Sequence, residues 1–133
     1  MITENERITL DFLDALNIAD FITVKDCLSD DFEFISPSKR TLDKETLCQN
    51  LPRTYEMIPD NRFNLIRILS QDDSVVMVTN RRGTFKKGTY FGVEANNQSF
   101  EIPFINIFDI EAGKIKRWEA HWNVQLLQQS QQK

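Results

Sequence analysis

The chain has 133 residues, of which 41% are hydrophobic and 27% are charged, and ten of them are phenylalanine. This length and composition predict one globular domain with a sizeable core. The net charge of −4 at pH 7 argues against a nucleic-acid partner, which would need a basic patch.

The apolar runs, the cysteines and the histidine of the sequence bear on the cellular compartment and on metal binding. The first seven residues contain no apolar signal core, and no apolar run approaches the length of a membrane span. Cys27 and Cys48 both fall in segments that we expect to be helical, which favours reduced, buried thiols in a cytoplasmic protein over a disulfide. One histidine and two scattered cysteines exclude the usual zinc sites, and we expect no metal and no cofactor.

The chain begins with two predicted helices. The segment T-E-N-E at residues 3–6 is a capping box, and apolar residues repeat at helical spacing behind it. We therefore expect a first helix over residues 4–19. Asp20 is placed to cap a short second helix over residues 21–28.

One short strand is predicted before a third helix. The strand covers residues 32–36 and ends at Pro37, and residues 38–40 are expected to form a loop. Asp43 is placed to cap the third helix, which continues to residue 58 with a kink or break at Pro52.

Residues 63–123 are predicted to form a β-sheet. Strands are expected over residues 63–69, 75–85, 100–110 and 114–123, with turns at 71–73, 96–97 and 112–113 and a bulge or bend at 86–88. Helices followed by an antiparallel meander are typical of an α+β domain, which we expect over residues 1–124. The polar, glutamine-rich tail over residues 125–133 is expected to fray.

The stretch G-K-I-K-R-W-E-A-H-W-N at residues 113–123 is the most informative for function. Side chains alternate across a strand, so Trp118, Ala120 and Trp122 share one face. The opposite face carries polar residues: Arg117, Glu119, His121 and Asn123. Two tryptophans flanking one alanine leave a small gap between large apolar walls, which is typical of a cavity floor and also of a packed core.

Two segments carry a resemblance to a known family. I-F-D-I-E-A-G-K-I-K-R-W-E-A-H-W-N resembles the final hairpin of the SnoaL-like and limonene epoxide hydrolase-like branch of the nuclear-transport-factor-2-like superfamily. V-M-V-T-N-R-R-G-T resembles the V-x-T-E-R-x-D strand of that branch. The resemblance implies a cone-shaped, curved antiparallel sheet wrapped around N-terminal helices, a cystatin-like α+β roll.

The resemblance also implies that the usual catalytic carboxylates are not retained. The epoxide hydrolases use an Asp-Arg-Asp set, whose arginine position falls on Arg81. The two aspartate positions fall on Gly83 and Ala120. Neither residue can transfer a proton, so this set cannot perform general acid–base catalysis here. The positions of a water-holding tyrosine and asparagine fall near Phe34 and Ser36.

Strand parity predicts an apolar, aromatic pocket. If Arg81 points inward, alternate residues on its own strand and on the neighbouring strands also point inward. The predicted lining from the long strands is Phe85, Ile102, Phe104, Trp118, Ala120 and Trp122, with Phe34 at the mouth or wall. Tyr55, in the third predicted helix, and Tyr90 could each donate a hydroxyl to a ligand. A concave apolar site with few polar groups is the usual form of a small-molecule pocket.

Arg81 is the one cation expected in this pocket. A buried guanidinium must be paired, because leaving it unpaired costs several kcal/mol. Either an anionic group of a ligand or an acid of the helices, such as Asp11 or Asp14, pairs with it, or the side chain extends to the rim of the pocket.

The sequence is compatible with three hypotheses about function. The first is a SnoaL-like protein without epoxide hydrolase activity that binds a small hydrophobic ligand, anionic if it meets Arg81. The second is an isomerase, cyclase or hydrolase with a relocated acid, for which a one-residue bulge could turn Glu119 inward. The third is a plugged cone that acts as a dimerisation or partner-binding domain.

The resemblance further implies a homodimer through the outer sheet face. That face would offer Val76, Val78, Ile105, Ile107 and His121. An exposed apolar sheet face of this kind needs covering. We expect neither nucleic acid nor membrane among the partners.

Overall fold

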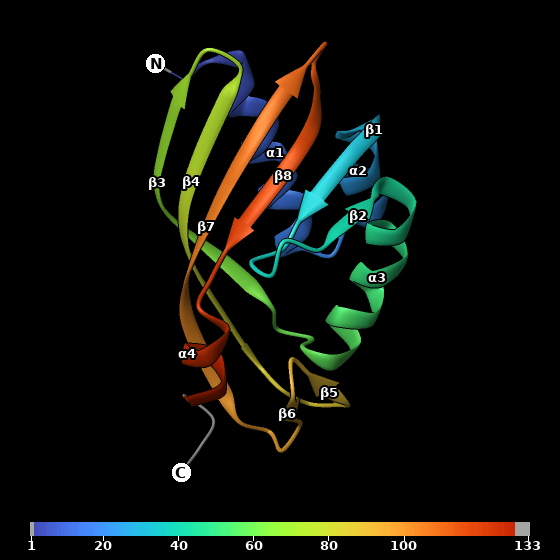
Figure 1. Ribbon diagram of the computed structural model, residues 1–133, viewed down its shortest axis with the longest axis vertical. Coiled ribbons are helices and arrows are strands. Elements are labelled where there is room, and N and C mark those ends of the chain that lie inside the picture. The colour runs from blue at the N-terminus through green and yellow to red at the C-terminus, as the bar shows by residue number, and fades with distance from the viewer. Residues whose placement is uncertain (1, 130–133) are drawn as a thin grey trace.

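A computed structural model describes residues 2–129 and has an α+β fold, in which a curved six-stranded sheet packs against helices (Figure 1). Its helices are α1 (Glu4–Asn17), α2 (Phe21–Asp26), α3 (Lys44–Met57) and α4 (Val124–Gln129). Its strands are β1 (Leu28–Ile35), β2 (Thr41–Asp43), β3 (Arg62–Gln71), β4 (Ser74–Thr84), β5 (Thr89–Tyr90), β6 (Val93–Glu94), β7 (Ser99–Glu111) and β8 (Lys114–His121). The predicted fold class is confirmed.

The two longest helices begin where the sequence predicts. The Thr3 hydroxyl accepts the Glu6 amide at 3.0 Å, and the Glu6 carboxylate accepts the Thr3 amide at 2.9 Å, which completes the capping box of α1. Asp43 caps α3 by accepting the Thr46 amide at 2.8 Å. Pro52 lies inside α3 without ending it.

The edge of the sheet differs from the prediction. The strand order is β2-β1-β8-β7-β4-β3, and β1 runs parallel to β8, with Phe34 opposite Trp118. β1 also begins at Leu28, because the chain leaves α2 at Asp26, two residues before the predicted end. The loop predicted at residues 38–40 is present, but the strand that follows it, β2, was not predicted and pairs antiparallel with β1. The sheet is therefore mixed rather than wholly antiparallel.

Two small elements at the lower end of Figure 1 were not predicted. β5 and β6 pair with each other as a separate two-stranded sheet, beyond the bend expected at residues 86–88. α4 occupies part of the predicted fraying tail, so that prediction is wrong for residues 125–129. Leu127 is 1% exposed and packs in a buried cluster with Ile58 and Phe100, which holds α4 in place. Residues 130–133 of the predicted tail lie outside the described residues.

The predicted parity of the central strands is confirmed. Along β4, Met77, Thr79 and Arg81 are buried, while the residues between them are half-buried. Arg81 lies opposite Phe63 on β3 and Ile102 on β7. The inner face of the sheet therefore carries both the core and Arg81, the one buried cation among the described residues.

The two cysteines and the lengths of the helices were also subjects of sequence predictions. Cys27 and Cys48 are free and half-buried, the first at the end of α2 and the second within α3. Among the described residues, no helix has the length and apolar character needed to cross a membrane.

Candidate functional site

A cavity of about 280 Å³ lies between the inner face of the sheet, α3 and the β5–β6 hairpin. Its wall is largely aromatic: Phe34, Tyr55, Phe63, Tyr90, Phe91, Phe104, Trp118 and Trp122. Small-molecule pockets span roughly 300–1,000 Å³, so this cavity suits a small ligand. No described residue that lines it is an aspartate, glutamate, histidine, lysine or cysteine.

Six of the nine residues predicted for the pocket line this cavity. They are Phe34, Tyr55, Arg81, Phe104, Trp118 and Trp122. The other three do not line it: Ala120 is fully buried in the main core, and Phe85 and Ile102 pack in the cluster around Leu127. Parity put all three on the correct face of the sheet. Their positions along the strands place their side chains against core residues and not against the cavity.

Arg81 is 4% exposed, and its hydrogen bonds go to neutral groups. Its Nε donates to Asn61 Oδ1 at 2.6 Å, and its Nη1 donates to the Tyr90 hydroxyl at 2.9 Å. Its guanidinium carbon lies 5.6 Å from the centre of the Phe104 ring. Within residues 2–129 it forms no ion pair, and Asp11 and Asp14, the acids considered as partners, are exposed on α1. The predicted pairing with the first helix is therefore wrong.

Asn61 is the site residue that sequence reasoning missed. It is buried and lies immediately before β3, the strand that pairs with the strand of Arg81. It also contacts Tyr55, whose hydroxyl donates to the Leu16 carbonyl at 2.7 Å. Burial raises the pKa of Tyr55, and the hydrogen bond with Asn61 and the charge of Arg81 oppose that rise. The turn sequence P-D-N before the strand is the signal that could have identified Asn61.

The two tryptophans of the cavity are held differently. Trp118 Nε1 donates to Asn106 Oδ1 at 2.9 Å, and the Asn106 amide donates to the Thr79 hydroxyl at 3.3 Å. Trp122 stacks on Phe104 with ring centres 4.8 Å apart. Its indole N–H is buried and has no hydrogen-bond partner in the described part of the chain. Trp118 is therefore fixed by a polar network, whereas Trp122 is held by ring packing.

The structure also describes the positions where the resemblance expects carboxylates. A Cβ added at Gly83 would lie 2.3 Å from Ile58 Cγ2, so an acid there would require that side chain to move. Ala120 is enclosed by core residues. Phe34 and Ser36, at the family's tyrosine and asparagine positions, both line the cavity.

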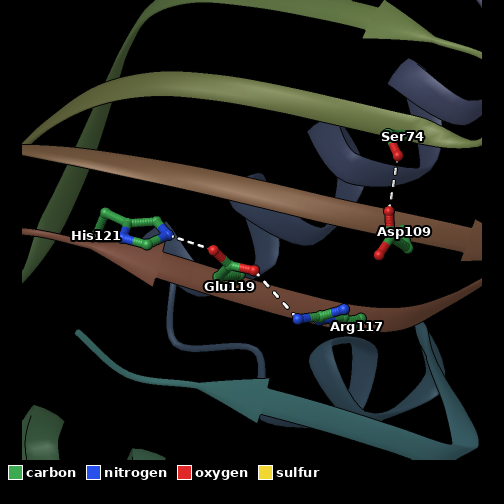
Figure 2. Close-up of polar contacts among 5 residues, drawn as sticks. All are labelled: Ser74, Asp109, Arg117, Glu119 and His121. Carbon is green, nitrogen blue, oxygen red and sulfur yellow. Dashed lines mark hydrogen bonds and ion pairs between the residues drawn. The ribbon is translucent and has the colours of Figure 1, made fainter. Parts of the chain in front are cut away.

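Glu119 lies on the outer face of the sheet and cannot serve as an acid inside the cavity. It pairs with His121 and Arg117 along β8, as Figure 2 shows. The hydrogen bond from His121 lowers the pKa of Glu119, whereas a general acid needs a raised pKa. The hypothesis of a bulge that turns Glu119 inward is wrong.

Comparisons with known proteins agree with this architecture. The family model described as SnoaL-like polyketide cyclase matches residues 7–130. No curated protein matches the chain.

Several solved structures share the fold. A candidate polyketide cyclase from Xanthomonas campestris pv. campestris has a TM-score of 0.89 at 17% identity, covering 97% of each chain. An NTF2-like protein of unknown function from Burkholderia pseudomallei has a TM-score of 0.83 at 15% identity, covering 99% of this chain and 100% of its own. An LEH-like epoxide hydrolase from M. tuberculosis has a TM-score of 0.80 at 18% identity, covering 98% of this chain and 90% of its own. At these identities the likeness shows the fold alone.

Proposed function

The chain belongs to the SnoaL-like polyketide cyclase family, and from this premise we propose that it binds a small hydrophobic anion in the aromatic cavity and lacks epoxide hydrolase activity. Arg81 holds the anionic group of the ligand, and the ring-lined wall holds its apolar body. A carboxylate on a one- or two-ring skeleton agrees with the cavity volume of about 280 Å³.

The observation that carries this proposal is the pairing of Arg81. Arg81 is 4% exposed and lines the cavity, and its guanidinium is bonded to an amide oxygen and a phenol rather than to a carboxylate. A buried charge without a counter-ion is costly. A ligand carboxylate would supply that counter-ion through the charge-assisted bonds for which the planar guanidinium is suited.

Binding rather than turnover is supported by the chemistry of the wall. Opening an epoxide or closing a ring through an enolate requires a group that exchanges a proton near neutral pH. The described lining offers hydroxyls, amides and arginines, but no carboxylate or imidazole. The alternative is an enzyme of the same fold that acts through a relocated acid. Its activity would change with pH as that acid gains or loses its proton.

Isothermal titration calorimetry with 2-naphthoate and its neutral analogue 2-naphthamide tests the proposal. We expect naphthoate to bind about tenfold more tightly or better, because a hydrogen bond to a charged group contributes about 1.5–3 kcal/mol. The variant Arg81→Met should lose this preference. Arg82→Met is the matched control, because Arg82 is exposed on the opposite face of β4. Equal affinity for acid and amide, or no binding of either, would contradict the proposal.

We also propose a homodimer through the outer sheet face. Support comes from Val76, Val78, Ile105 and Ile107, which are half-buried on that face of the isolated chain, and from Leu69 beside them, which is exposed. Covering such a face removes apolar surface from water. We expect light scattering to give a dimer at micromolar concentration and a monomer for Ile107→Lys. A monomeric unmodified protein would count against the dimer.

We further propose that the protein works in the cytoplasm. The proposal is supported by the two free cysteines, Cys27 and Cys48. Burial raises the pKa of both thiols, which keeps them in the unreactive protonated form. A thiol assay on protein purified without reductant should find both thiols free, and a disulfide would contradict this assignment.

A further inference from the structure

The β5–β6 hairpin lies at one side of the cavity and is held by its side chains rather than by pairing with the main sheet. Its two strands pair with each other and not with the main sheet. Gly88 precedes the hairpin and Gly92 lies at its tip, with φ of +75° and +78°, and Phe91 at the tip has φ of +49°. An isolated two-stranded hairpin is marginally stable in water. The position of this hairpin therefore depends on the contacts of its side chains and tip.

Val93 packs in the buried cluster around Ile58, and Tyr90 and Phe91 make further contacts with the rest of the molecule. The Tyr90 hydroxyl accepts Arg81 Nη1 at 2.9 Å. The Phe91 ring lies edge-on to Trp122, with ring centres 5.4 Å apart. The Phe91 carbonyl accepts Gln128 Nε2 at 2.8 Å. The hydrogen bond of Tyr90 uses the same guanidinium that the proposed function assigns to the ligand.

We infer that Tyr90 is a gate residue, whose hydroxyl occupies Arg81 in the empty protein and is replaced there by the anionic group of the ligand. This inference rests on the proposed function of the same cavity. Asn61 takes Nε and the phenol takes Nη1, so a carboxylate that bonds to both Nη atoms as a fork would compete with the phenol for Nη1. An ionised acceptor forms the stronger bond, so a carboxylate displaces the hydroxyl and a neutral amide does not. Tyr90 thereby sharpens the preference for anions.

The indole of Trp122 supplies a second reason for the hairpin to move. Its N–H is buried and has no partner within residues 2–129, and its ring lies beside that of Phe91. A buried donor that lacks an acceptor is unfavourable. Displacement of the hairpin tip would open this N–H to water or to an acceptor on the ligand. Among the described residues, the indole N–H of Trp122 therefore stays unsatisfied while the Phe91 ring lies against it.

The first test compares the affinity of Tyr90→Phe and of the unmodified protein for 2-naphthoate by calorimetry. Removing the hydroxyl leaves Arg81 with one partner fewer in the empty state, so naphthoate should bind about fivefold more tightly, as expected for one modest hydrogen bond. Thr89→Val is the matched control, because Thr89 is exposed on the same strand, and its affinity should equal that of the unmodified protein. Equal or weaker binding by Tyr90→Phe would overturn the gate.

The second test needs no ligand. Amide hydrogen exchange measures local opening, and in Tyr90→Phe we expect faster exchange over residues 88–94 with unchanged exchange in β4 and β7. Unchanged exchange in the hairpin would overturn its dependence on the Arg81 bond. The two proposals fail separately, because absence of naphthoate binding to the unmodified protein rejects the proposed function and leaves the exchange result to judge the hairpin.

Discussion

Two buried asparagines each hold one polar group of the cavity wall. Asn61 accepts from Arg81, and Asn106 accepts from the indole of Trp118 while donating to Thr79. An asparagine side chain offers one acceptor and two donor hydrogens, so it can join groups that have no other partner. The orientation of the wall therefore depends on amides that do not themselves belong to a catalytic motif.

Replacing Asn106 should be costly for stability. Asn106→Leu would leave the buried indole N–H of Trp118 without its acceptor, and we expect the free energy of unfolding to fall by about 2–3 kcal/mol. Urea denaturation followed by circular dichroism measures this change. Asn64→Leu is the control, because Asn64 is half-buried on β3, and it should change stability by about 0.5 kcal/mol or less. Equal losses in both variants would refute the role of the buried amide.

At the scale of single residues, the sequence predicted which side chains point inward but not how they are paired. Alternation along β4 correctly placed Arg81 on the inner face, because the period of a strand is two residues. Its partners Asn61 and Tyr90 come from a turn and a hairpin. No periodic pattern connects such segments to β4, so the pairing could not be predicted.

Among the elements, α4 shows how a polar composition can conceal a buried residue. All six residues of α4 are Val, Leu or Gln, in an order with little amphipathic signal, yet Leu127 is 1% exposed while its neighbour Leu126 is 40% exposed. One buried leucine in a six-residue segment that is half glutamine is too weak a pattern to predict a docked helix. Packing against β7 and the cluster around Ile58 decides its position.

This neighbouring pair gives a matched test of the helix. Leu127→Ala should lower the free energy of unfolding by about 2–4 kcal/mol, because it empties a buried site. Leu126→Ala should lower it by less than about 1 kcal/mol, because that side chain is already exposed to water. Urea denaturation of both variants measures the difference. Similar small effects would mean that α4 does not contribute to the core.

The edge of the sheet marks the limit of sequence prediction at this scale. The helix starts at Thr3 and Asp43 were predictable, because their caps are local hydrogen bonds between residues three apart. The parallel pairing of β1 with β8 joins segments far apart in the chain. That register depends on the closing of the whole cone and leaves no signature within either strand.

For the molecule as a whole, the distribution of charge predicts how binding responds to pH. The chain carries a net charge of −4, yet the cavity contains Arg81 and, from the loop after β1, Arg40. An arginine keeps its charge across the physiological range, and burial raises the pKa of Tyr55 further above that range. His121 and Glu119, which pair with each other, lie on the outer face.

The affinity for 2-naphthoate should therefore stay constant between about pH 6 and pH 9. The ligand is ionised throughout this interval, and the cavity residues that we assign to binding keep their charge. Calorimetry at several pH values, in buffers of equal ionic strength, measures the profile. A bell-shaped or sigmoidal profile would reveal a titrating group at the site and would favour the catalytic alternative.

Both tryptophans of the chain stand in the wall of the cavity. All of the indole fluorescence of the protein therefore originates at the proposed site, one emitter hydrogen-bonded to Asn106 and the other stacked between rings. Quenching or a spectral shift on titration would report occupancy directly, without a label. Rapid mixing could then follow the arrival of an anion at Arg81 and the displacement of Phe91 from Trp122 as two phases of the change in tryptophan fluorescence.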